Sequence, residues 1–404
     1  MKPEKNITIL AIETSCDDTG IAIVKAGKNG SFKVLSNIVS SQVEVHKKWG
    51  GVYPMMAKRE HQKNIVPVLK EALKKSKMLK NSKPRTLKLE LKTLKSILER
   101  EKDLQKPLIN FLQKHQKPNI NLIAVTNGPG LEPCLWVGVN FAKALANTWK
   151  LPIVTVNHLK AHIFVNTGLT KKNLPAVCLI ASGGHTLLFL MKDFGKYKIL
   201  GETRDDAAGE CFDKAARILG LKYPGGPEIS KKAAEFTGKR TIKLPRPMIN
   251  TKDYDFSFSG LKTAVLYNAL KKKKRNKKYI QEMCKEVQQA IIDVLIKKTM
   301  DAAINKKAKA IILGGGVTAN KELRRQLQER AKKLIPKTKL FFPKPENCTD
   351  NAFMTAIAGY FRYKSGEKEN RISLSTPRNC SGLNWKKIKV NANLKIRTCL
   401  RAEP

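Results

Sequence analysis

Apolar and polar positions alternate along the chain in a pattern that predicts a β/α architecture. Short apolar runs bounded by glycine, proline or polar residues are typical of buried strands, and longer segments with apolar residues three or four apart are typical of helices. Strands are predicted over Ile7–Ile12, Gly20–Val24, Asn121–Val125, Ile153–Val156, Ala176–Ala181 and Ala310–Leu313, and helices over His61–Leu73 and Val137–Trp149. Because strands and helices alternate in this order, we expect an α/β fold with two lobes.

One segment, residues 74–118, departs from this rhythm. It contains no glycine and is rich in lysine, and Leu87, Leu91, Leu94 and Leu98 fall on one helical face. This pattern favours an inserted basic helical element whose apolar stripe packs on the first lobe rather than on a partner.

Two further segments are strongly basic. Lys271–Arg275, continued by Lys277 and Lys278, lies in a predicted connection between helices. Such a run is usually a solvated loop, but it also suits contact with RNA. The tail after Thr376 is basic and has little apolar pattern.

Composition sets broad limits on the class of protein. A chain of 404 residues is long enough for two ordinary domains with their own cores. Hydrophobic residues make up 42% of it, mean hydropathy is −0.35, and no apolar run is long enough to span a bilayer. The first apolar stretch begins at Ile7 and leads directly to Glu13, so we expect no signal or transit peptide and a cytoplasmic location. The eight scattered cysteines form no CxxC pair, which favours reduced thiols.

Charge adds a partner class to this picture. The chain has 78 Lys and Arg against 33 Asp and Glu, a net charge of +45. A protein this basic binds phosphate backbones through counterion release. Codon bias of an AT-rich genome is another source of lysine, although such bias would tend to raise Glu as well. The imbalance therefore favours a nucleic-acid partner, with a membrane surface as the minor alternative.

Two histidines stand at a spacing that suits a metal ion. His158 and His162 are four residues apart, so on a helix their rings share one face. Only six histidines occur in the chain, which favours a metal pair over two structural side chains. The zinc-protease signature HExxH needs Glu directly after the first histidine to act as base, and this chain has Leu159 there. A metallopeptidase would therefore lack its catalytic residue.

Glycine-rich turns follow two of the predicted strands. Ser182–Thr186 follows one and Gly314–Asn320 follows another, and backbone N–H groups in such turns can approach phosphate or carbonyl oxygens. With the polar turn Glu13–Thr19, they are typical of a two-lobed phosphotransferase-type fold. The sequence has no GxxxxGK followed by Ser or Thr, which excludes a P-loop protein.

Other polar residues allow both a structural and a functional interpretation. Asp206, Glu210 and Asp213 share a face of a predicted helix that opens at Asp205, where they serve its N-terminal dipole or hold ribose hydroxyls or a metal. Ser259–Lys262 has the SxxK spacing of a nucleophile, but so short a match arises easily by chance.

Taken together, these motifs belong to a longer series of blocks. In chain order the blocks are Glu13–Gly20, Gly50–Pro54, Gly128–Gly130, His158 with His162, Ser182–Thr186, Asp205–Glu210 with Phe212–Lys214, Tyr223–Pro227, Phe256–Thr263, Gly314–Gly316 with Asn320, and Thr349–Asn351. The series resembles the TsaD family, the tRNA N6-adenosine threonylcarbamoyltransferases, over nearly the whole chain. The Ser-Gly-Gly-His-Thr form of the fifth block is similar to the bacterial branch.

The resemblance implies an α/β fold of the actin-like (ASKHA) kind, with two RNase H-like domains around a cleft. We expect a first lobe over residues 1–156 with the insertion at about 74–118, and a second lobe over 157–345. A helix over 346–366 is expected at the cleft, packing back on the lobes, followed by a basic C-terminal tail over 367–404.

The resemblance also implies a reaction and a site. The family transfers a threonylcarbamoyl group from threonylcarbamoyl-AMP to N6 of the adenosine 3′ of the anticodon, in tRNAs reading codons that begin with A, and releases AMP. One divalent metal, Fe(II) or Zn(II), would bind His158, His162 and Asp350, and Glu13 would be a general base or an orienting residue. The acyl-adenylate would contact Ile180, Ala181, Ser182, Gly183, Gly184, Asp213, Gly226 and Asn320. Expected partners are tRNA and TsaB-like and TsaE-like proteins, with no membrane.

Three places depart from the family pattern. Ser230 stands where some relatives have Asp, Leu131–Cys134 replaces small residues, and most relatives lack the insertion at 74–118. Two other functions remain as alternatives, a metallopeptidase and a non-catalytic tRNA-binding scaffold.

Overall fold

A computed structural model of the protein describes residues 6–27, 30–83, 88–166, 168–272, 275–365 and 387–396. The chain divides into two compact units. Unit 1 is Met1–Gln42, Val52–Val165 and Asp350–Lys395, and unit 2 is Val43–Gly51, Asn166–Thr349 and Ile396–Pro404. The predicted boundary after residue 156 therefore differs from the observed one after Val165. The reason is that α6 (His158–Phe164) packs on β4, β5 and α12 of unit 1.

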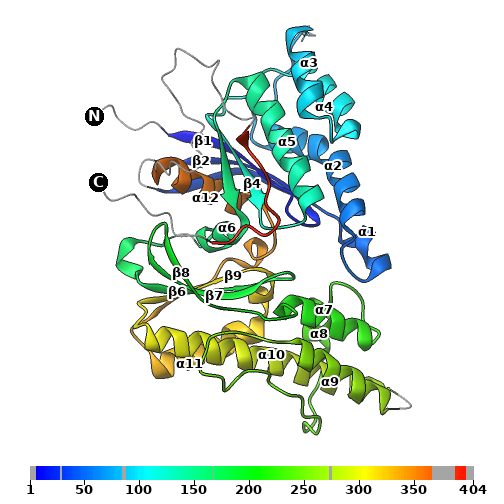
Figure 1. Cartoon of the computed structure of the whole chain (residues 1–404), viewed down its shortest axis with the longest axis vertical. Coiled ribbons are helices and arrows are strands. Elements are labelled where there is room, and N and C mark those ends of the chain that lie inside the picture. The colour runs from blue at the N-terminus through cyan, green and yellow to red at the C-terminus, as the bar shows by residue number, and fades with distance from the viewer. Residues whose placement is uncertain are drawn as a thin grey trace. The chain divides into compact units, whose positions relative to one another are not determined.

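Unit 1 is built on a five-stranded sheet in the order β3-β2-β1-β4-β5 (Figure 1). β1 pairs antiparallel with β2 and parallel with β4, β2 pairs antiparallel with β3, and β4 pairs parallel with β5. β1 and β4 are buried almost throughout, which explains their unbroken apolar runs. The strands are β1 (Ile7–Glu13), β2 (Asp18–Ala26), β3 (Phe32–Ser41), β4 (Leu122–Gly128) and β5 (Ile153–Asn157).

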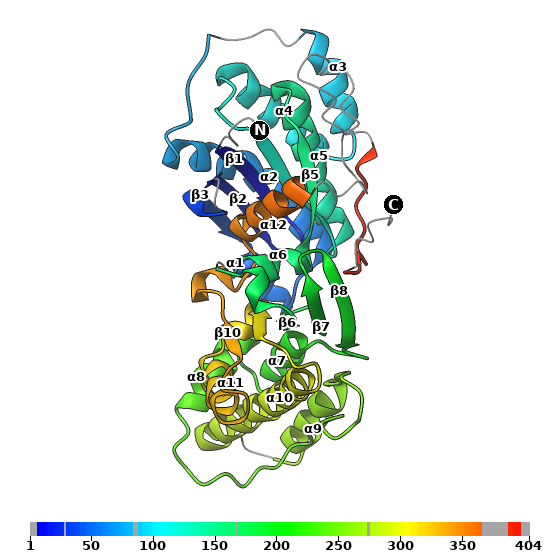
Figure 2. The ribbon, with the colours of Figure 1, turned by 90° about the vertical axis from the view of Figure 1, so that its left-hand side faces the viewer.

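Helices cover both faces of this sheet (Figure 2). α2 (Pro54–Lys75) and α5 (Glu132–Trp149) pack on one face, where Leu10 and Ile12 of β1 join the core. α12 (Ala352–Ser365) packs on β1, β2, β4 and β5. It approaches closely because Gly359 has no side chain: a Cβ there would lie 2.6 Å from that of Ala124. The helix predicted over 346–366 is thus a helix of unit 1 that begins at Ala352.

The predicted insertion forms two helices, α3 (Lys88–Ile97) and α4 (Lys102–Lys114). Leu94 and Leu98 are fully buried in the core of unit 1, and Leu91 packs against it. The expectation that this stripe packs on the first lobe is confirmed for these three residues, whereas Leu87 lies outside the described residues. α3 contacts α5, and α4 contacts α2.

Unit 2 repeats the strand order of unit 1 when its sheet is followed from the opposite edge, from β8 to β10. Its five-stranded sheet runs β10-β9-β6-β7-β8, with antiparallel β6–β7 and β7–β8 pairs and parallel β6–β9 and β9–β10 pairs. Each unit therefore has three antiparallel strands followed by two parallel ones, as in an RNase H-like domain. The strands are β6 (Ala176–Ala181), β7 (Thr186–Asp193), β8 (Lys196–Glu202), β9 (Ala310–Gly314) and β10 (Lys339–Phe341).

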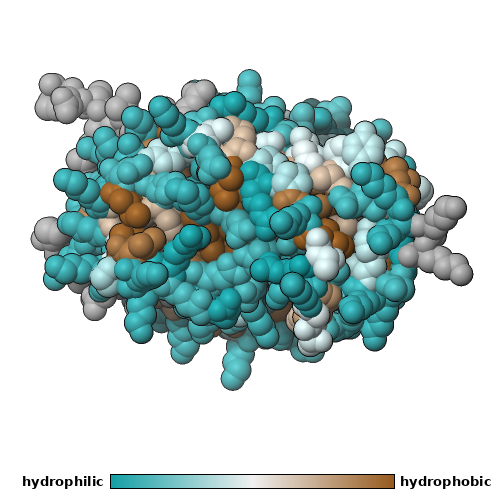
Figure 3. Space-filling view, turned by 90° about the horizontal axis from the view of Figure 1, so that it is seen from below, coloured by the Kyte–Doolittle hydropathy of each residue, from teal (hydrophilic) through white to brown (hydrophobic). Residues whose placement is uncertain are grey.

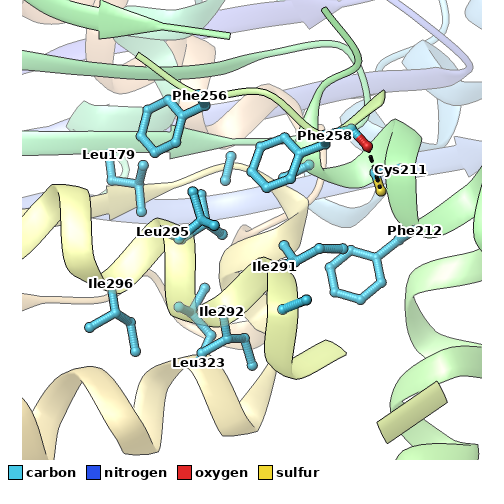
Figure 4. Packing of buried hydrophobic residues seen from close by; sticks show 14 of the residues in the cluster. Leu179, Cys211, Phe212, Phe256, Phe258, Ile291, Ile292, Leu295, Ile296 and Leu323 are labelled. Atoms are coloured by element: carbon cyan, nitrogen blue, oxygen red, sulfur yellow. Dashed lines mark hydrogen bonds between the residues drawn. The ribbon is translucent and has the colours of Figure 1, made fainter. Parts of the chain in front are cut away.

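The core of unit 2 lies between β6 and the long helix α10 (Figure 4). Phe256 and Phe258 meet Ile291 and Leu295 of α10 there, and all four side chains are fully buried. The α-helices are α1 (Val43–His46), α7 (Ala208–Ile218), α8 (Gly225–Ala234), α9 (Ser259–Leu270), α10 (Lys277–Asn305) and α11 (Lys321–Leu334). The 3-10 helices are η1 (Lys47–Trp49), η2 (Lys171–Asn173), η3 (Gly316–Ala319) and η4 (Pro345–Asn347).

Two composition-based expectations can be compared with the described part of the chain. Six of the eight cysteines lie there, and all six are free thiols. Burial raises the pKa of Cys134, Cys211 and Cys284 to about 12, so these thiols stay protonated. Cys380 and Cys399 lie outside the described residues. In the same part of the chain, every helix is too short or too polar to cross a membrane.

Candidate functional site

The two histidines of the predicted pair lie at the start of α6, directly after β5. Asn157 ends β5 and caps α6, because its Oδ1 accepts a hydrogen bond from Lys160 N at 3.1 Å. His158 is the first helical residue and His162 follows one turn later, so their ring centroids are 4.7 Å apart. Both side chains are buried, as the apolar residues between them are.

Asp350 completes a three-residue cluster with the histidines. It lies just before α12, and its Oδ1 is 3.5 Å from His158 Nε2 and 3.2 Å from His162 Nε2. Among the described residues, this is the one group of His, Cys, Asp or Glu side chains whose ligand atoms all lie within 4.8 Å of one another. Ligand atoms around a tetrahedral zinc ion are roughly 3.3 Å apart, so the spacing suits a shared ion.

Glu13 lies behind His158, on the side of the ring away from Asp350. Its Oε2 is 3.6 Å from His158 Nδ1, and Ser15 Oγ is 3.1 Å from the same nitrogen. A metal-binding imidazole typically presents one nitrogen to the ion while a carboxylate or hydroxyl contacts the other. The two sides of His158 show this division.

The carboxylate of Glu13 is itself held on both oxygens. Oε1 accepts a hydrogen bond from Ser15 N at 2.9 Å, and Oε2 accepts from the hydroxyls of Thr126 at 2.5 Å and Thr355 at 2.9 Å. Burial alone would raise the pKa of Glu13, but the charge of His158 and the bond from Thr126 lower it below its usual range. A fully buried, ionised carboxylate with these partners is built to hold a neighbouring group in place.

The residues of this cluster fit a divalent metal. Two imidazoles and one carboxylate suit Fe(II) or Zn(II) and leave coordination positions open for a substrate. Within the described residues neither ring nitrogen of His162 forms a hydrogen bond, although its Nε2 faces Asp350. Burial lowers the pKa of His158, but the charges of Asp350 and Glu13 outweigh this and raise it to about 9. A cation at the Nε2 atoms would replace that proton.

Unit 2 carries the remaining predicted site residues, beginning with Ile180, Ala181, Ser182, Gly183 and Gly184. They form the end of β6 and its turn into β7, where Ser182 N donates to His185 O at 2.8 Å. Gly209 of α7 and Gly315 after β9 pack against this turn, and a Cβ on either would lie 2.5 Å from a carbonyl oxygen of the turn. Gly183 and Gly184 are exposed and open to solvent, with room for a ligand above them.

The other three predicted contacts are Asp213, Gly226 and Asn320, and each is hydrogen-bonded to α8 or belongs to it. Asp213 Oδ1 accepts from Gly225 N at 2.7 Å, which fixes the start of α8. Ser230 Oγ donates to Gly226 O at 2.9 Å and accepts from Asn320 Nδ2 at 2.9 Å. Asp213 thus contacts the first residue of α8, and Ser230, the residue that departs from the family pattern, joins Gly226 to Asn320.

The acidic residues and the SxxK match have structural partners. Asp206 lies before α7 rather than on it, and Lys214 bridges Asp206 at 2.7 Å and Glu210 at 2.8 Å. The predicted shared helical face is therefore wrong for Asp206. Ser259 Oγ donates to Asp205 Oδ2 at 2.7 Å, and Asp205 Oδ1 accepts from the backbone N–H groups of Phe258 and Ser259 at the start of α9. Lys262 Nζ lies 3.4 Å from Asp206 Oδ2, so it has an acidic partner of its own.

The sequence did not predict four residues that support the cluster of His158, His162 and Asp350. These residues are Ser15, Thr126, Asn157 and Thr355. Asn157 had a usable signal, because Asn directly before a helix is a common cap. Thr126 and Thr355 had none, since they reach Glu13 only through strand pairing and through the packing of α12 on the sheet.

Fold and site together define a class: an actin-like α/β protein of two RNase H-like units that carries a histidine–carboxylate cluster of metal-binding type. The fold matches the crystal structure of full-length HypF in its phosphate- and nucleotide-bound form, with a TM-score of 0.50 at 12% identity over 90% of this chain and 56% of that one.

The sequence comparisons are more specific. The profile of the TsaD family, tRNA N6-adenosine threonylcarbamoyltransferase, matches residues 33–82 and 106–357. A tRNA N6-adenosine threonylcarbamoyltransferase of Geobacillus kaustophilus is 41% identical over 375 residues, 92% of this chain and 96% of the relative. One from Bacillus anthracis is 42% identical over 367 residues, 90% of this chain and 94% of the relative. The chain belongs to the TsaD family, and it is a transferase that modifies tRNA.

Proposed function

We propose that the chain transfers the threonylcarbamoyl group from threonylcarbamoyl-AMP to N6 of the adenosine 3′ of the anticodon, in tRNAs that read codons beginning with A. The N6 amine attacks the carbamoyl carbon, the bond from that carbon to the phosphate oxygen breaks, AMP leaves, and the amine loses a proton. The observation that carries the proposal is the His158–His162–Asp350 cluster, whose two imidazoles are buried, in a member of this transferase family.

The chemistry determines what the protein must supply. The lone pair of an exocyclic adenine amine is delocalised into the ring, so the amine is a weak nucleophile. The donor is already activated as a mixed anhydride, and the main contribution left to the protein is alignment of the two substrates. Rigid, buried side chains such as those of the cluster suit that task.

We assign His158, His162 and Asp350 as ligands of one divalent metal, Fe(II) or Zn(II). When bound, such an ion supplies Lewis acidity and open positions for oxygen atoms of the donor. Glu13 acts as a positioning residue, because it is fully buried and its oxygens are engaged by Ser15, Thr126 and Thr355. This environment supports the orienting role over that of general base, which needs access to the substrate.

The donor's nucleotide end is assigned to unit 2. Backbone N–H groups in the exposed turn at Gly183 and Gly184 suit phosphate or developing oxyanion charge. Asp213, which accepts from Gly225 N, and Gly226 and Asn320, which Ser230 links, suit the polar atoms of a nucleoside. Gly226 leaves open space where a side chain would otherwise stand.

A basic surface formed after the end of α9 and at the start of α10 is our candidate for tRNA contact. Lys271, Lys272, Lys277 and Lys278 are exposed there, beside Tyr267, which is 60% exposed. Figure 3, with the helices of unit 2 toward the viewer, shows mostly hydrophilic surface interrupted by separate apolar areas. Lysines bind phosphates and an exposed aromatic ring can stack on a base, which together suit an RNA loop. Lys273 and Lys274 lie outside the described residues.

A cytoplasmic location and TsaB-like and TsaE-like partners belong to the same proposal. The decisive assay combines this chain, those partners, threonylcarbamoyl-AMP and unmodified tRNA, and detects the modified nucleoside by mass spectrometry. Wild type should give the modified nucleoside and free AMP in equal amounts, Asp350→Ala should give neither, and the matched exposed-acid variant Glu346→Ala should resemble wild type.

Each rival makes a different forecast in this assay. A metallopeptidase would cleave added protein in a metal-dependent way without modifying tRNA. The sequence already counts against it, because Leu159 stands where the HExxH motif has its catalytic Glu. A non-catalytic scaffold would bind tRNA and tolerate loss of Asp350 and Glu13. Absence of the nucleoside with the complete wild-type mixture would overturn the transferase proposal.

A further inference from the structure

A C-terminal segment, residues 387–395, docks on unit 1 beside the metal cluster's supports. It is drawn in red in Figure 1 and lies beyond residue 357, where the family profile ends its match. Ile388 is buried in the core of unit 1. We call residues 387–395 the C-terminal clamp.

The clamp is hydrogen-bonded to the last residues of β4 and to the turn that follows this strand. Asn127 Nδ2 donates to Lys389 O at 3.2 Å, Asn391 N donates to Asn127 O at 2.9 Å, and Gly130 N donates to Ala392 O at 3.1 Å. The contact is so close that a Cβ on Gly128 would lie 1.9 Å from Asn391 O. Gly128 has φ +146°, which also favours glycine. The turn is thus shaped to receive the clamp's backbone.

The last residues of the clamp contact Asn157, and both the nitrogen and the oxygen of its side-chain amide form hydrogen bonds. Nδ2 donates to Leu394 O at 3.3 Å and Lys395 O at 3.5 Å, while Oδ1 caps α6 through Lys160 N. Asn157 is buried. One side chain therefore ties the clamp to the helix turn that begins with His158.

Both docking points adjoin a support of the metal cluster. Asn127 follows Thr126, whose hydroxyl donates to Glu13 behind His158, and Asn157 precedes His158 itself. The clamp thus touches the chain next to both groups that set the position of the His158 ring.

We infer that the C-terminal clamp is a positioning element of the metal site and that Asn157 is the positioning residue through which it acts. The clamp fixes Asn157, Asn157 fixes the first turn of α6, and that turn presents His158 and His162 at the spacing a metal needs. This inference rests on the proposed metal site and deepens it, since it adds a distant segment to the determinants of metal affinity.

Truncation tests the inference directly. A chain that ends at residue 386 lacks the clamp, and a matched control that ends at Ile396 keeps it. Zn²⁺ affinity is measured on each by competition with a chromophoric chelator. We expect the chain ending at 386 to lose roughly 10- to 100-fold in affinity, the usual effect of removing outer contacts of a metal site, and the control to match the full chain.

Point variants cover the case in which the shorter chain fails to fold. Asn157→Ser keeps a hydroxyl that can cap α6 but cannot reach the carbonyls of Leu394 and Lys395. It should lose affinity, and it should not add to the loss in a chain ending at 386, because both changes break the same connection. Asn157→Ala removes the cap of α6 as well, so it should lose more affinity than Asn157→Ser does. Leu98→Ala is the control, because it empties a buried position of the same core in the α3–α4 insertion, outside the clamp; it should lower the unfolding temperature and leave affinity intact.

The experiments distinguish a failure of the proposed metal site from a failure of the clamp inference. A wild-type chain that binds no Zn²⁺, Fe²⁺ or other divalent ion overturns the proposed metal site. Wild-type affinity in Asn157→Ser, or losses that add fully in the combined variant, overturn the clamp while leaving the metal site standing.

Discussion

At the scale of single residues, His158 is the side chain on which the site depends. Its Nε2 faces Asp350 and its Nδ1 faces Glu13 and Ser15, so both nitrogens are committed. A fixed ring orientation follows, and it favours tight binding of a metal at Nε2.

Glu13→Gln tests the orienting role of the buried carboxylate. The amide keeps the shape of the side chain but removes the negative charge behind His158, so metal affinity should fall roughly 10- to 100-fold. Thr355→Val, which removes one hydrogen bond to Glu13, should show a smaller loss. Chelator competition measures both. Unchanged affinity together with lost transfer activity would instead assign Glu13 to proton removal.

The pKa of His158 predicts a pH dependence of stability for the metal-free protein. Folding raises this pKa from 6.5 to about 9, so the folded state holds the proton more tightly than the unfolded chain does. The stabilisation is complete below pH 6.5 and is lost as pH rises through 9, a change on the order of 3 kcal/mol. Urea unfolding with a chelator present, in wild type and His158→Gln, measures it. Identical slopes in the two proteins would contradict the assignment.

Residue patterns could reveal only part of this site. The His158–His162 spacing predicts a shared helical face, which the structure confirms. Asp350 came only from resemblance, because no spacing rule connects residues so far apart in the chain. Ser15, Thr126 and Thr355 meet Glu13 through tertiary packing, which local sequence does not encode.

At the scale of elements, the α3–α4 insertion is an integral part of the core of unit 1. Leu94, Leu98, Leu104 and Leu108 are all fully buried. In the turn between the helices, buried Glu101 accepts from Asn140 Nδ2 at 3.2 Å and lies 3.4 Å from Lys58 Nζ. The insertion is therefore tied to α5 and α2 by polar as well as apolar contacts.

Leu98→Ala tests whether the insertion is structural. Emptying this fully buried position should cost about 2–5 kcal/mol in the free energy of unfolding. The same substitution at Leu91, which is only partly buried, should cost clearly less. Urea unfolding compares them. Equal and negligible effects would mean that the insertion does not stabilise unit 1.

Four lysines, two after the end of α9 and two at the start of α10, give the second element-scale prediction. Replacing Lys271, Lys272, Lys277 and Lys278 with Gln should weaken tRNA binding and flatten its salt dependence, by up to about 0.7–0.9 in slope for each phosphate that is no longer neutralised. The control changes the same charge elsewhere, at the exposed lysines 332, 333, 337 and 339. Equal effects of the two sets would show general attraction rather than a site.

The strength of the apolar pattern decided which strands could be predicted from the sequence. β1, β4, β6 and β9 are buried strands with unbroken apolar runs, and the predicted strands overlap all four. β8 (Lys196–Glu202) alternates lysine with partly buried residues at the edge of its sheet, a pattern typical of protected edges and easily missed.

At the scale of the whole molecule, the repeated strand order is the organising feature. Two units with the same order, three antiparallel strands and then two parallel ones, define the actin-like class. Alternating strands and helices predicted an α/β protein, but the repeat is a property of strand pairing and is invisible in local pattern. For the same reason the sequence placed the histidines in the second lobe, whereas packing of α6 places them in unit 1.

The central claim is that His158, His162 and Asp350 hold one divalent metal ion for tRNA modification. Metal content of the purified chain, measured by inductively coupled plasma mass spectrometry, tests it most directly. The account predicts about one Fe or Zn ion for each wild-type chain, and loss of that ion in His158→Ala, His162→Ala and Asp350→Ala, since a site of three protein ligands tolerates little loss. Full metal content in any of these variants would contradict it.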